Sequence, residues 1–293
     1  MGIHRSLKGA FWTWVALACC PAAGQVAPAG AVRISVVDCS AEQFVAEGMP
    51  QARADASEFR KAFAVLEHMG LEAADLSNDA QAGQLELADT DLLIIHRLTA
   101  LTRASLAENA QALGEFVARG GTVVQVTPAD QEQQVVDWLP QPLGAMITDL
   151  DFSQVNIEDP VHPLFSTPNP LSEADVAKIT QRRGAPPAAG GAAAATSPVS
   201  WESFQGFREA KLLLTNRRQG RAPAVPAAGM LEFEHGDGRI LLMSLRPFGA
   251  YLAPGTAETR HVVVALMENL LEYGRMVRAG RAPAVEPRVT FPW

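Results

Sequence analysis

The residues of this 293-residue chain with the greatest chemical capacity come directly after short apolar runs. One run, 32–37, is followed by a carboxylic acid and a thiol, and a second run, 92–95, is followed by an imidazole and a guanidinium. These four residues are Asp38, Cys39, His96 and Arg97. Together such groups could supply a general base, a nucleophile and an anion clamp. They are therefore the first candidates for a functional site.

Two further apolar runs are followed by polar residues in the same way. Thr127 and Asp130 follow the run 122–126, and Arg246 follows the run 239–244. In an open parallel sheet, ligands bind beyond the carboxyl ends of the strands, near the point where the strand order reverses. We therefore predict one ligand-binding edge, called here the strand-end rim, formed by Asp38, Cys39, His96, Arg97, Thr127, Asp130 and Arg246.

Each rim residue also has a purely structural interpretation. His96 is a base at the edge of the sheet or a histidine that caps its strand, and Arg97 binds a carboxylate or phosphate or pairs with a nearby acid. Cys39 is a nucleophile if His96 lies beside it, and otherwise an inert buried thiol. Asp38 is a base or ligand contact, or an N-cap for the following turn.

The sequence lacks the usual signatures of nucleotide cofactors, serine hydrolases and zinc enzymes. It contains no GxGxxG, no P-loop, no GxSxG and no HExxH. The three cysteines are Cys19, Cys20 and Cys39, and none belongs to a CxxC pair or to a cluster of cysteine and histidine. We expect no cofactor and no metal site.

The elements that would position the rim follow a strand–helix–strand pattern. Buried strands are expected at 32–37, 91–96 and 122–126, with a further possible strand at 71–76 and helices at 59–69 and 101–119. Alternation of this kind predicts a parallel sheet with right-handed crossovers.

The second half of the chain has fewer clear elements. A strand is expected at 211–215, and a hairpin joins the runs 230–234 and 239–244 across a Gly-Asp-Gly turn. A helix is expected over 261–273. The segment 184–198 is rich in alanine, proline and glycine and is predicted to be a flexible low-complexity loop.

The N-terminus has the composition of a signal peptide. A basic start, a short apolar run and small residues predict removal of 1–24, a linker at 25–31, a domain over 32–275 and a Pro/Arg-rich tail at 276–293. We expect an exported protein, either periplasmic or secreted. Two alternatives remain open: a lipoprotein acylated at Cys19, and translation from an internal start codon without export.

Charge and hydropathy restrict the partners. The formal net charge is −8, which argues against nucleic acid and against an anionic membrane surface. No segment has the roughly 20 uninterrupted apolar residues that a transmembrane helix needs. The expected partner is a small polar ligand or a protein of the cell envelope, and a homo-oligomer is left open.

Three segments in this order resemble the class I glutamine amidotransferase-like superfamily. They are the stretch 91–124, with DLLIIHRL and FVARGGTVV at its ends, the segment 159–165 (DPVHPLF), and the hairpin and helix 236–273 (GDGRILL and LMENLLEY). The resemblance is to a branch that includes trehalose-utilisation-like proteins and the trimerisation domain of some beta-galactosidases. It implies an α/β fold with a flavodoxin-like, doubly wound, mostly parallel sheet, followed by a C-terminal β-hairpin and helix.

One departure from that family bears on activity. Active amidotransferases carry a cysteine on a tight elbow after the strand that corresponds to 122–126, whereas this chain continues there with Thr127 and Pro128. No His-x-Glu pair is present either. Glutamine hydrolysis is therefore not expected. The favoured interpretation is a non-catalytic binding or assembly domain, with a carbohydrate link. The alternative is a hydrolase or isomerase of small polar, sugar-derived compounds that uses the rim.

Overall fold

A computed structural model describes residues 32–50, 60–126, 134–140, 143–152, 154–179, 199–217, 227–252 and 257–286. These residues belong to one compact unit, Val32–Trp293. The predicted signal peptide, the linker, the loop 184–198 and the last residues of the tail lie outside the described ranges.

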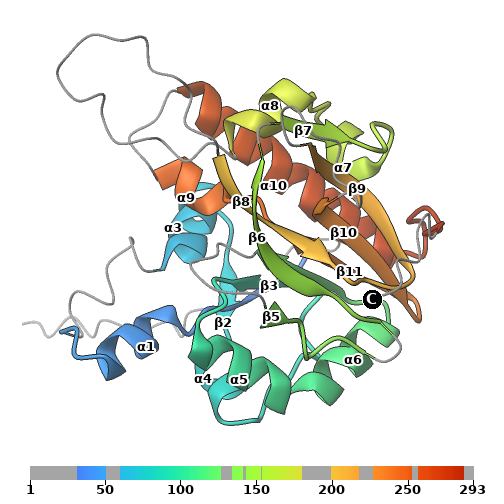
Figure 1. Ribbon diagram of the computed structural model, residues 1–293. Coiled ribbons are helices and arrows are strands. Elements are labelled where there is room, and N and C mark those ends of the chain that lie inside the picture. Colours follow the sequence, from blue (N-terminus) through green and yellow to red (C-terminus); the bar gives the residue numbers. More distant parts are fainter. Residues whose placement is uncertain are drawn as a thin grey trace, which may run out of the picture. The chain divides into compact units, whose positions relative to one another are not determined.

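A parallel sheet forms the centre of the fold (Figure 1). Its strands, in spatial order, are β2 (Ala73–Asp75), β1 (Ile34–Val37), β3 (Leu92–His96), β4 (Thr122–Val126) and β11 (Gly238–Met243). Each neighbouring pair is parallel. Taken in chain order, this arrangement is the 2-1-3-4-5 order of flavodoxin-like folds. The predicted fold class is confirmed.

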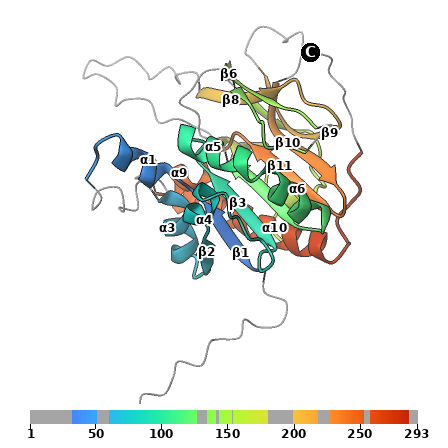
Figure 2. The same cartoon turned by 90° about the horizontal axis from the view of Figure 1, so that it is seen from below.

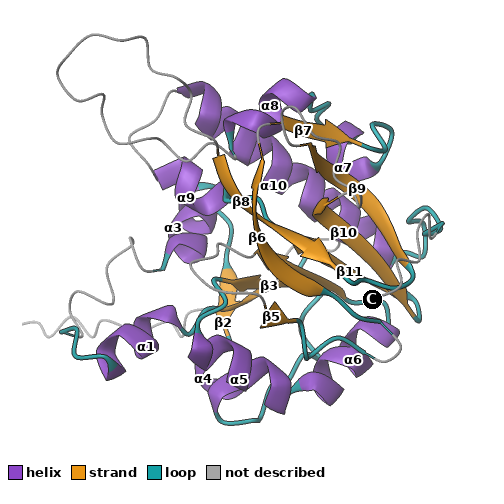
Figure 3. Ribbon diagram, viewed as in Figure 1, coloured by secondary structure: helices purple, strands orange, loops and turns teal. Residues whose placement is uncertain are grey.

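An antiparallel region extends this sheet beyond β11 (Figure 3). The strand β10 (Ala227–His235) forms the predicted hairpin with β11, in which His235 lies opposite Gly238. The turn between them contains Gly236, whose φ of 59° is in the left-handed region that glycine tolerates. The remaining strands are β5 (Gln134–Val135), β6 (Met146–Phe152), β7 (Gln154–Ile157), β8 (Val199–Gln205) and β9 (Ala210–Arg217). Of these, only β9 was expected from the sequence.

Helices cover both faces of the parallel sheet because side chains alternate across each strand. Leu92 and Ile94 of β3 belong to one core, with α3 (Lys61–His68), α9 (Pro247–Leu252) and α10 (Ala257–Arg278). The next residues along the strand, Leu93 and Ile95, belong to the other core. Figures 1 and 2 show this arrangement. The helices of the second face are α4 (Ser77–Gln81), α5 (Ala100–Glu108) and α6 (Ala110–Ala118).

Among the described helices, α10 is the longest. The helices not yet named are short: α1 (Ser40–Ala46), α7 (Pro163–Ser166) and α8 (Glu173–Lys178). None of the described helices combines the length and the apolar composition that crossing a membrane requires.

The single helix expected over 101–119 is in fact two helices, α5 and α6, which meet at Asn109. The Asn109 amide donates hydrogen bonds to the carbonyls of Ala80 and Ser105, and its carbonyl accepts one from the backbone N–H of Leu85. An asparagine whose side chain binds nearby backbone groups competes with a continuous helix. The helical pattern of the sequence was correct, but the break at its centre was missed.

Candidate functional site

The first two rim residues meet at the point where the strand order reverses. From β1 the chain first adds β2 on one side and then β3 on the other, so the switch point lies between β1 and β3. Asp38 directly follows β1, and His96 is the last residue of β3. In flavodoxin-like sheets the ligand crevice lies at this position.

Asp38 and His96 form a buried hydrogen-bonded pair. The Nδ1 of His96 lies 2.8 Å from Oδ2 of Asp38, and the two side chains are 5% and 0% exposed. The other carboxylate oxygen accepts the backbone N–H of Ser40 at 3.1 Å and also the hydroxyl of Ser40. Because an ionised carboxylate only accepts, Nδ1 carries the proton, and Nε2 of a neutral His96 is left as an acceptor.

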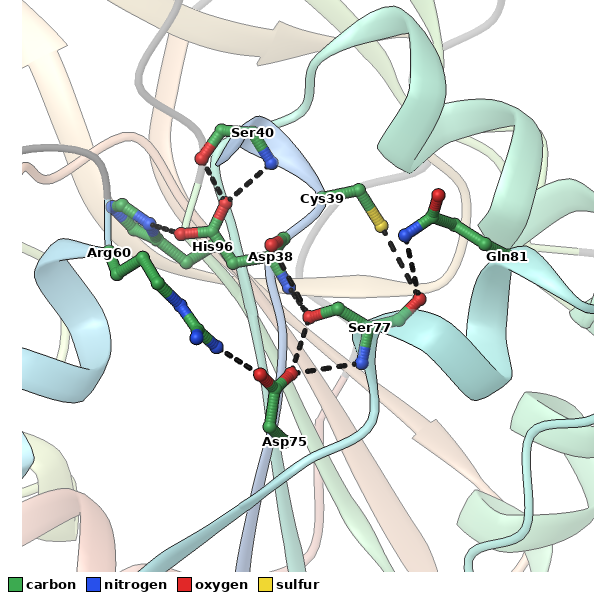
Figure 4. A network of polar contacts seen from close by, with 8 residues as sticks. All are labelled: Asp38, Cys39, Ser40, Arg60, Asp75, Ser77, Gln81 and His96. Atoms are coloured by element: carbon green, nitrogen blue, oxygen red, sulfur yellow. Dashed lines mark hydrogen bonds and ion pairs between the residues drawn. The ribbon is translucent and has the colours of Figure 1, made fainter. Parts of the chain in front are cut away.

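The pair continues into a polar network across the carboxyl ends of three strands (Figure 4). Ser77 accepts the backbone N–H of Asp38 at 3.0 Å, and its hydroxyl donates to Asp75 at 2.7 Å. Asp75 is the last residue of β2 and forms an ion pair with Arg60. The network therefore links Asp75 of β2, Asp38 after β1 and His96 of β3. Its hydrogen bonds hold the imidazole of His96 in one orientation.

Arg60, Asp75 and Ser77 were not selected from the sequence. Two of them, Asp75 and Ser77, lie at the end of the strand-like run 71–76, which is the signal that selected Asp38 and His96. Arg60 follows no apolar run and has no comparable signal.

An aromatic ring covers one side of His96. The ring of Phe248, from α9, meets the imidazole edge-on at a centroid distance of 5.1 Å, and Phe248 is 1% exposed. An apolar neighbour of this kind lowers the local dielectric, which strengthens the hydrogen bond between His96 and Asp38. Within the described residues, no hydrogen-bond partner reaches Nε2.

Cys39 follows Asp38 in the chain but lies on the other side of the sheet. It is fully buried in the core that contains Ile95, and its Sγ is 3.8 Å from the carbonyl oxygen of Ser77. The pKa of the thiol is raised to about 12, mainly by burial; the hydroxyl of Ser105 opposes this rise and the carboxylate of Glu42 adds to it. The thiolate needed for nucleophilic attack is therefore scarce at neutral pH.

Arg97 adopts an unusual backbone conformation immediately after His96. Its φ is 60°, in the left-handed region, and its N–H donates to the carbonyl of Val126 at 3.2 Å. The guanidinium lies over the ring of Phe44, from α1, at 4.7 Å. No carboxylate within the described part of the chain forms an ion pair with Arg97. The interpretation of Arg97 as the partner of a nearby acid is not supported there.

The other rim residues are less informative. Arg246 lies in the link between β11 and α9, where its carbonyl accepts the N–H of Ala250 at 2.9 Å. Thr127 and Asp130 lie outside the described residues. The structure thus brings together Asp38 and His96, and it puts Cys39 apart from the imidazole.

A second buried polar cluster lies away from the rim. The Nδ1 of His162 accepts the N–H of Leu164 at 3.3 Å, and Nε2 lies 3.3 Å from Glu232, to which Tyr273 also donates. Burial, together with the charge of Glu232, raises the pKa of Tyr273. Because His162 and Glu232 are almost completely inaccessible, this cluster holds β10, α7 and α10 together. Among the described residues, no group of three histidine, cysteine or acidic side chains is arranged to hold a metal ion.

Among known proteins, similarity to this chain is found in solved structures. No protein-family model matches the chain, and no curated protein matches its sequence. A beta-galactosidase from Rahnella sp. R3 is 11% identical, with a TM-score of 0.42 over 82% of this chain. The chain spans 31% of that beta-galactosidase, so it corresponds to about a third of its length.

Two smaller proteins are similar over most of their own length. A ThuA-like protein from Bacteroides uniformis is 8% identical, with a TM-score of 0.36 over 84% of this chain and 90% of its own. A protein from Thermoplasma acidophilum, described as part of a GMP synthase, is 9% identical, with a TM-score of 0.39 over 83% and 96%. These are proteins of the kinds that the sequence resemblance names, and membership of the superfamily stays a prediction.

Proposed function

We propose that this chain is an exported, non-catalytic binding domain that holds a small polar ligand at the strand-end rim. The observation that carries the proposal is the Asp38–His96 pair at the β1/β3 switch point. A buried carboxylate fixes the imidazole so that Nε2 can accept a hydrogen bond. Ligand-binding sites combine an apolar lining with a few fixed polar groups of this kind, and Phe248 supplies apolar surface beside the imidazole.

The lack of a usable nucleophile favours binding over covalent catalysis. Cys39 is the one cysteine of the chain after residue 20, and its buried thiol has a pKa of about 12. The sequence that follows β4 contains no cysteine. An amidotransferase-like reaction requires a thiolate beside a histidine, which these residues do not supply. The carbohydrate link and the export of the chain rest on the sequence alone.

A second candidate function is hydrolysis or isomerisation of a small polar compound, with His96 as general base. The observation that favours it is the same hydrogen bond, because an aspartate that fixes Nδ1–H is how many enzymes orient a basic imidazole. In this version Nε2 removes a proton from the ligand or from water, and Asp38 stabilises the imidazolium that forms. A binding domain would retain its ligand unchanged.

The first experiment is a thermal-shift screen of the chain from residue 25 onward against sugars, sugar acids, other small polar compounds and phosphates. A ligand at a hundredfold excess over its Kd stabilises the folded state by about 2.7 kcal/mol. We expect at least one compound to raise the melting temperature of the parent and of His235→Ala, but not of His96→Ala. His235 is a fair control because it precedes the amino end of β11, at the opposite edge of the sheet.

The outcome decides between the alternatives. A bound compound that is recovered unchanged after long incubation supports the binding domain, whereas conversion that disappears in His96→Ala supports the general base. A shift of equal size in the parent and in His96→Ala would rule out the rim as the binding site and would overturn both proposals.

A further inference from the structure

We propose that the ligand is a hydroxy acid carrying one carboxylate, with the carboxylate bound by Arg97 and a neighbouring hydroxyl donating to Nε2 of His96. The proposal rests on the proposed function, since it assumes that the rim binds a ligand, and it adds the chemical class of that ligand. It is carried by three features of consecutive residues: an available guanidinium, an unusual backbone conformation, and a fixed imidazole tautomer.

No acidic side chain among the described residues pairs with the guanidinium of Arg97, which leaves it available for an anion. Arg33 pairs with Asp89 and Asp91, and Arg60 pairs with Asp75. Arg97 instead lies over the ring of Phe44 at 4.7 Å, with no acidic partner in the described ranges. Stacking occupies the face of the guanidinium and leaves its in-plane N–H groups free, and those groups match a carboxylate in a two-pronged contact.

Arg97 has a backbone conformation that is energetically unfavourable for a residue with a side chain. A φ of 60° is unfavourable for a residue with a side chain, and glycine would adopt it without strain. The turn is closed by hydrogen bonds from Arg97 N–H to Val126 and from Thr99 N–H to the Arg97 carbonyl at 2.8 Å. Strained residues of this kind concentrate at ligand sites. Apart from its stacking on Phe44, an arginine here gives the fold nothing that glycine would not, whereas it gives a binding site a cation.

The imidazole specifies the second ligand group. Because Asp38 accepts the hydrogen bond from Nδ1–H, the neutral form of His96 presents a lone pair at Nε2. A carboxylate placed there would face that lone pair and be repelled, whereas a hydroxyl would donate to it. The two neighbouring residues therefore favour different ligand groups: Arg97 favours an anion, and His96 favours a hydrogen-bond donor.

Local charge argues for one negative charge rather than the two of a phosphate ester. Glu42 on α1 is close enough to Asp38 and Asp75 to feel both charges. Burial, with these carboxylates, raises the pKa of Glu42 against the opposing charge of Arg60. One of its carboxylate oxygens is buried and has no hydrogen-bond partner among the described residues. Arg60 already pairs with Asp75, so a dianion beside the remaining carboxylates would be repelled, whereas Arg97 can balance a single carboxylate.

The test compares three ligands that differ by one feature. Gluconate carries a carboxylate and hydroxyls, sorbitol has the hydroxyls without the charge, and hexanoate has the carboxylate without the hydroxyls. Isothermal titration of the chain from residue 25 is expected to show gluconate binding at least tenfold more tightly than either analogue. Glucose 6-phosphate, a dianion, is expected to bind more weakly than gluconate.

Variants separate the two contacts. Arg97→Gln should weaken gluconate binding at least tenfold and leave sorbitol binding unchanged. Arg97→Gly should do the same without a large loss of heat stability, because relief of the left-handed φ offsets the lost contact with Phe44. Arg119→Gln is the control, since Arg119 is exposed at the amino end of β4 and pairs only weakly with Glu115.

Equal binding of gluconate and sorbitol, or full binding by Arg97→Gln, would overturn the hydroxy-acid proposal. If neutral sugars then bind in a way that depends on His96, the proposed function survives and only the ligand class is wrong. If none of the four compounds binds but another polar ligand requires His96, the ligand class is again wrong. If no polar ligand requires His96, both proposals fail.

Discussion

At the scale of single residues, Asp38 and His96 determine the character of the site, because the carboxylate of Asp38 accepts a hydrogen bond from Nδ1–H of His96. Both were selected from the sequence because each follows an apolar run, and the structure joins them at 2.8 Å. Their partner Ser77 was missed, because the run before it is interrupted by Glu72 and Asp75 and was not treated as the end of a buried strand. The left-handed backbone conformation of Arg97 could not be predicted, because a positive φ at an arginine has no signal in composition or periodicity.

The first prediction concerns the tautomer of His96. In Asp38→Asn the new amide can donate but can no longer accept as an ionised carboxylate does, so the proton is expected to move from Nδ1 to Nε2. Nitrogen NMR of the imidazoles reads the tautomer directly. Loss of charge-assisted hydrogen bonds should also lower the free energy of unfolding by about 1.5–3 kcal/mol, measured in urea.

Asp237→Asn is the matched control for that change, because Asp237 is exposed in the β10–β11 turn. Its stability and its histidine spectrum should equal those of the parent. An unchanged tautomer of His96 in Asp38→Asn would show that the carboxylate does not orient the imidazole.

The second prediction concerns Cys39, which is the only cysteine in the chain from residue 25 onward. Its pKa of about 12, against an ordinary 9.0, corresponds to about a thousandfold less thiolate near neutral pH. Alkylation by iodoacetamide at pH 8 should therefore be slower in the folded protein than in guanidinium chloride by at least that factor. Alkylation at equal rates in the two states would mean that the thiol is exposed and reactive.

At the scale of elements, the sequence specified the parallel strands much better than the antiparallel ones. The runs that became β1, β3 and β4 consist mostly of apolar residues, as is usual for strands buried on both faces. By contrast, β6 (MITDLDF) contains two aspartates, which are rare in strands, and it pairs with β8, some 50 residues away in the sequence. Pairing over such a distance is not encoded in any local pattern.

The third prediction concerns the junction of α5 and α6. Asn109→Ala removes three hydrogen bonds, including the one that satisfies the backbone N–H of Leu85, so buried groups lose their partners. We expect the free energy of unfolding to fall by about 2–4 kcal/mol, on the basis of 1–3 kcal/mol for each unsatisfied buried group. Urea denaturation measures this loss.

Gln111→Ala provides the comparison, because Gln111 is exposed and bonds only to Glu115 along the same helix. That change should shift the stability by less than about 0.5 kcal/mol. Equal effects of the two substitutions would mean that Asn109 does not hold the junction together.

The fourth prediction concerns the ion pair between Asp159 and Lys211, which links the segment after β7 to β9 at 2.7 Å. Burial alone would raise the pKa of Asp159, but the hydrogen bond and the charge of Lys211 outweigh it and hold the pKa below 3.8. A depressed folded-state pKa contributes stability above the unfolded pKa, and that stability is lost as the pH falls through the folded value.

Asp159→Asn should therefore be less stable than the parent at pH 7, by about 1.5–3 kcal/mol, and the difference should shrink as the pH falls below about 4. Urea midpoints between pH 7 and pH 3 measure it. A difference that stays constant with pH would show that the charge of Asp159 does not contribute.

At the scale of the whole molecule, the flavodoxin-like strand order puts the Asp38–His96 pair where such sheets bind ligands. The order agreed with the expected fold class because strand and helix alternate in the first half of the chain. The ligand could not be predicted, because the same fold carries many functions and the decisive contacts are single side chains. Solved structures of similar fold, at 8–11% identity in the examples above, do not supply it either.

The most direct measurement of the central claim is a titration of isotope-labelled chain with a ligand from the screen, following the imidazole nitrogens by NMR. We expect the NMR signal of Nε2 of His96 to shift as the ligand binds, while Nδ1 keeps its proton and the signals of His235 stay unchanged. We also expect the ligand's own spectrum to remain that of the starting compound. A ligand that binds while the nitrogens of His96 stay unchanged would contradict the claim that the β1/β3 switch point is the binding site.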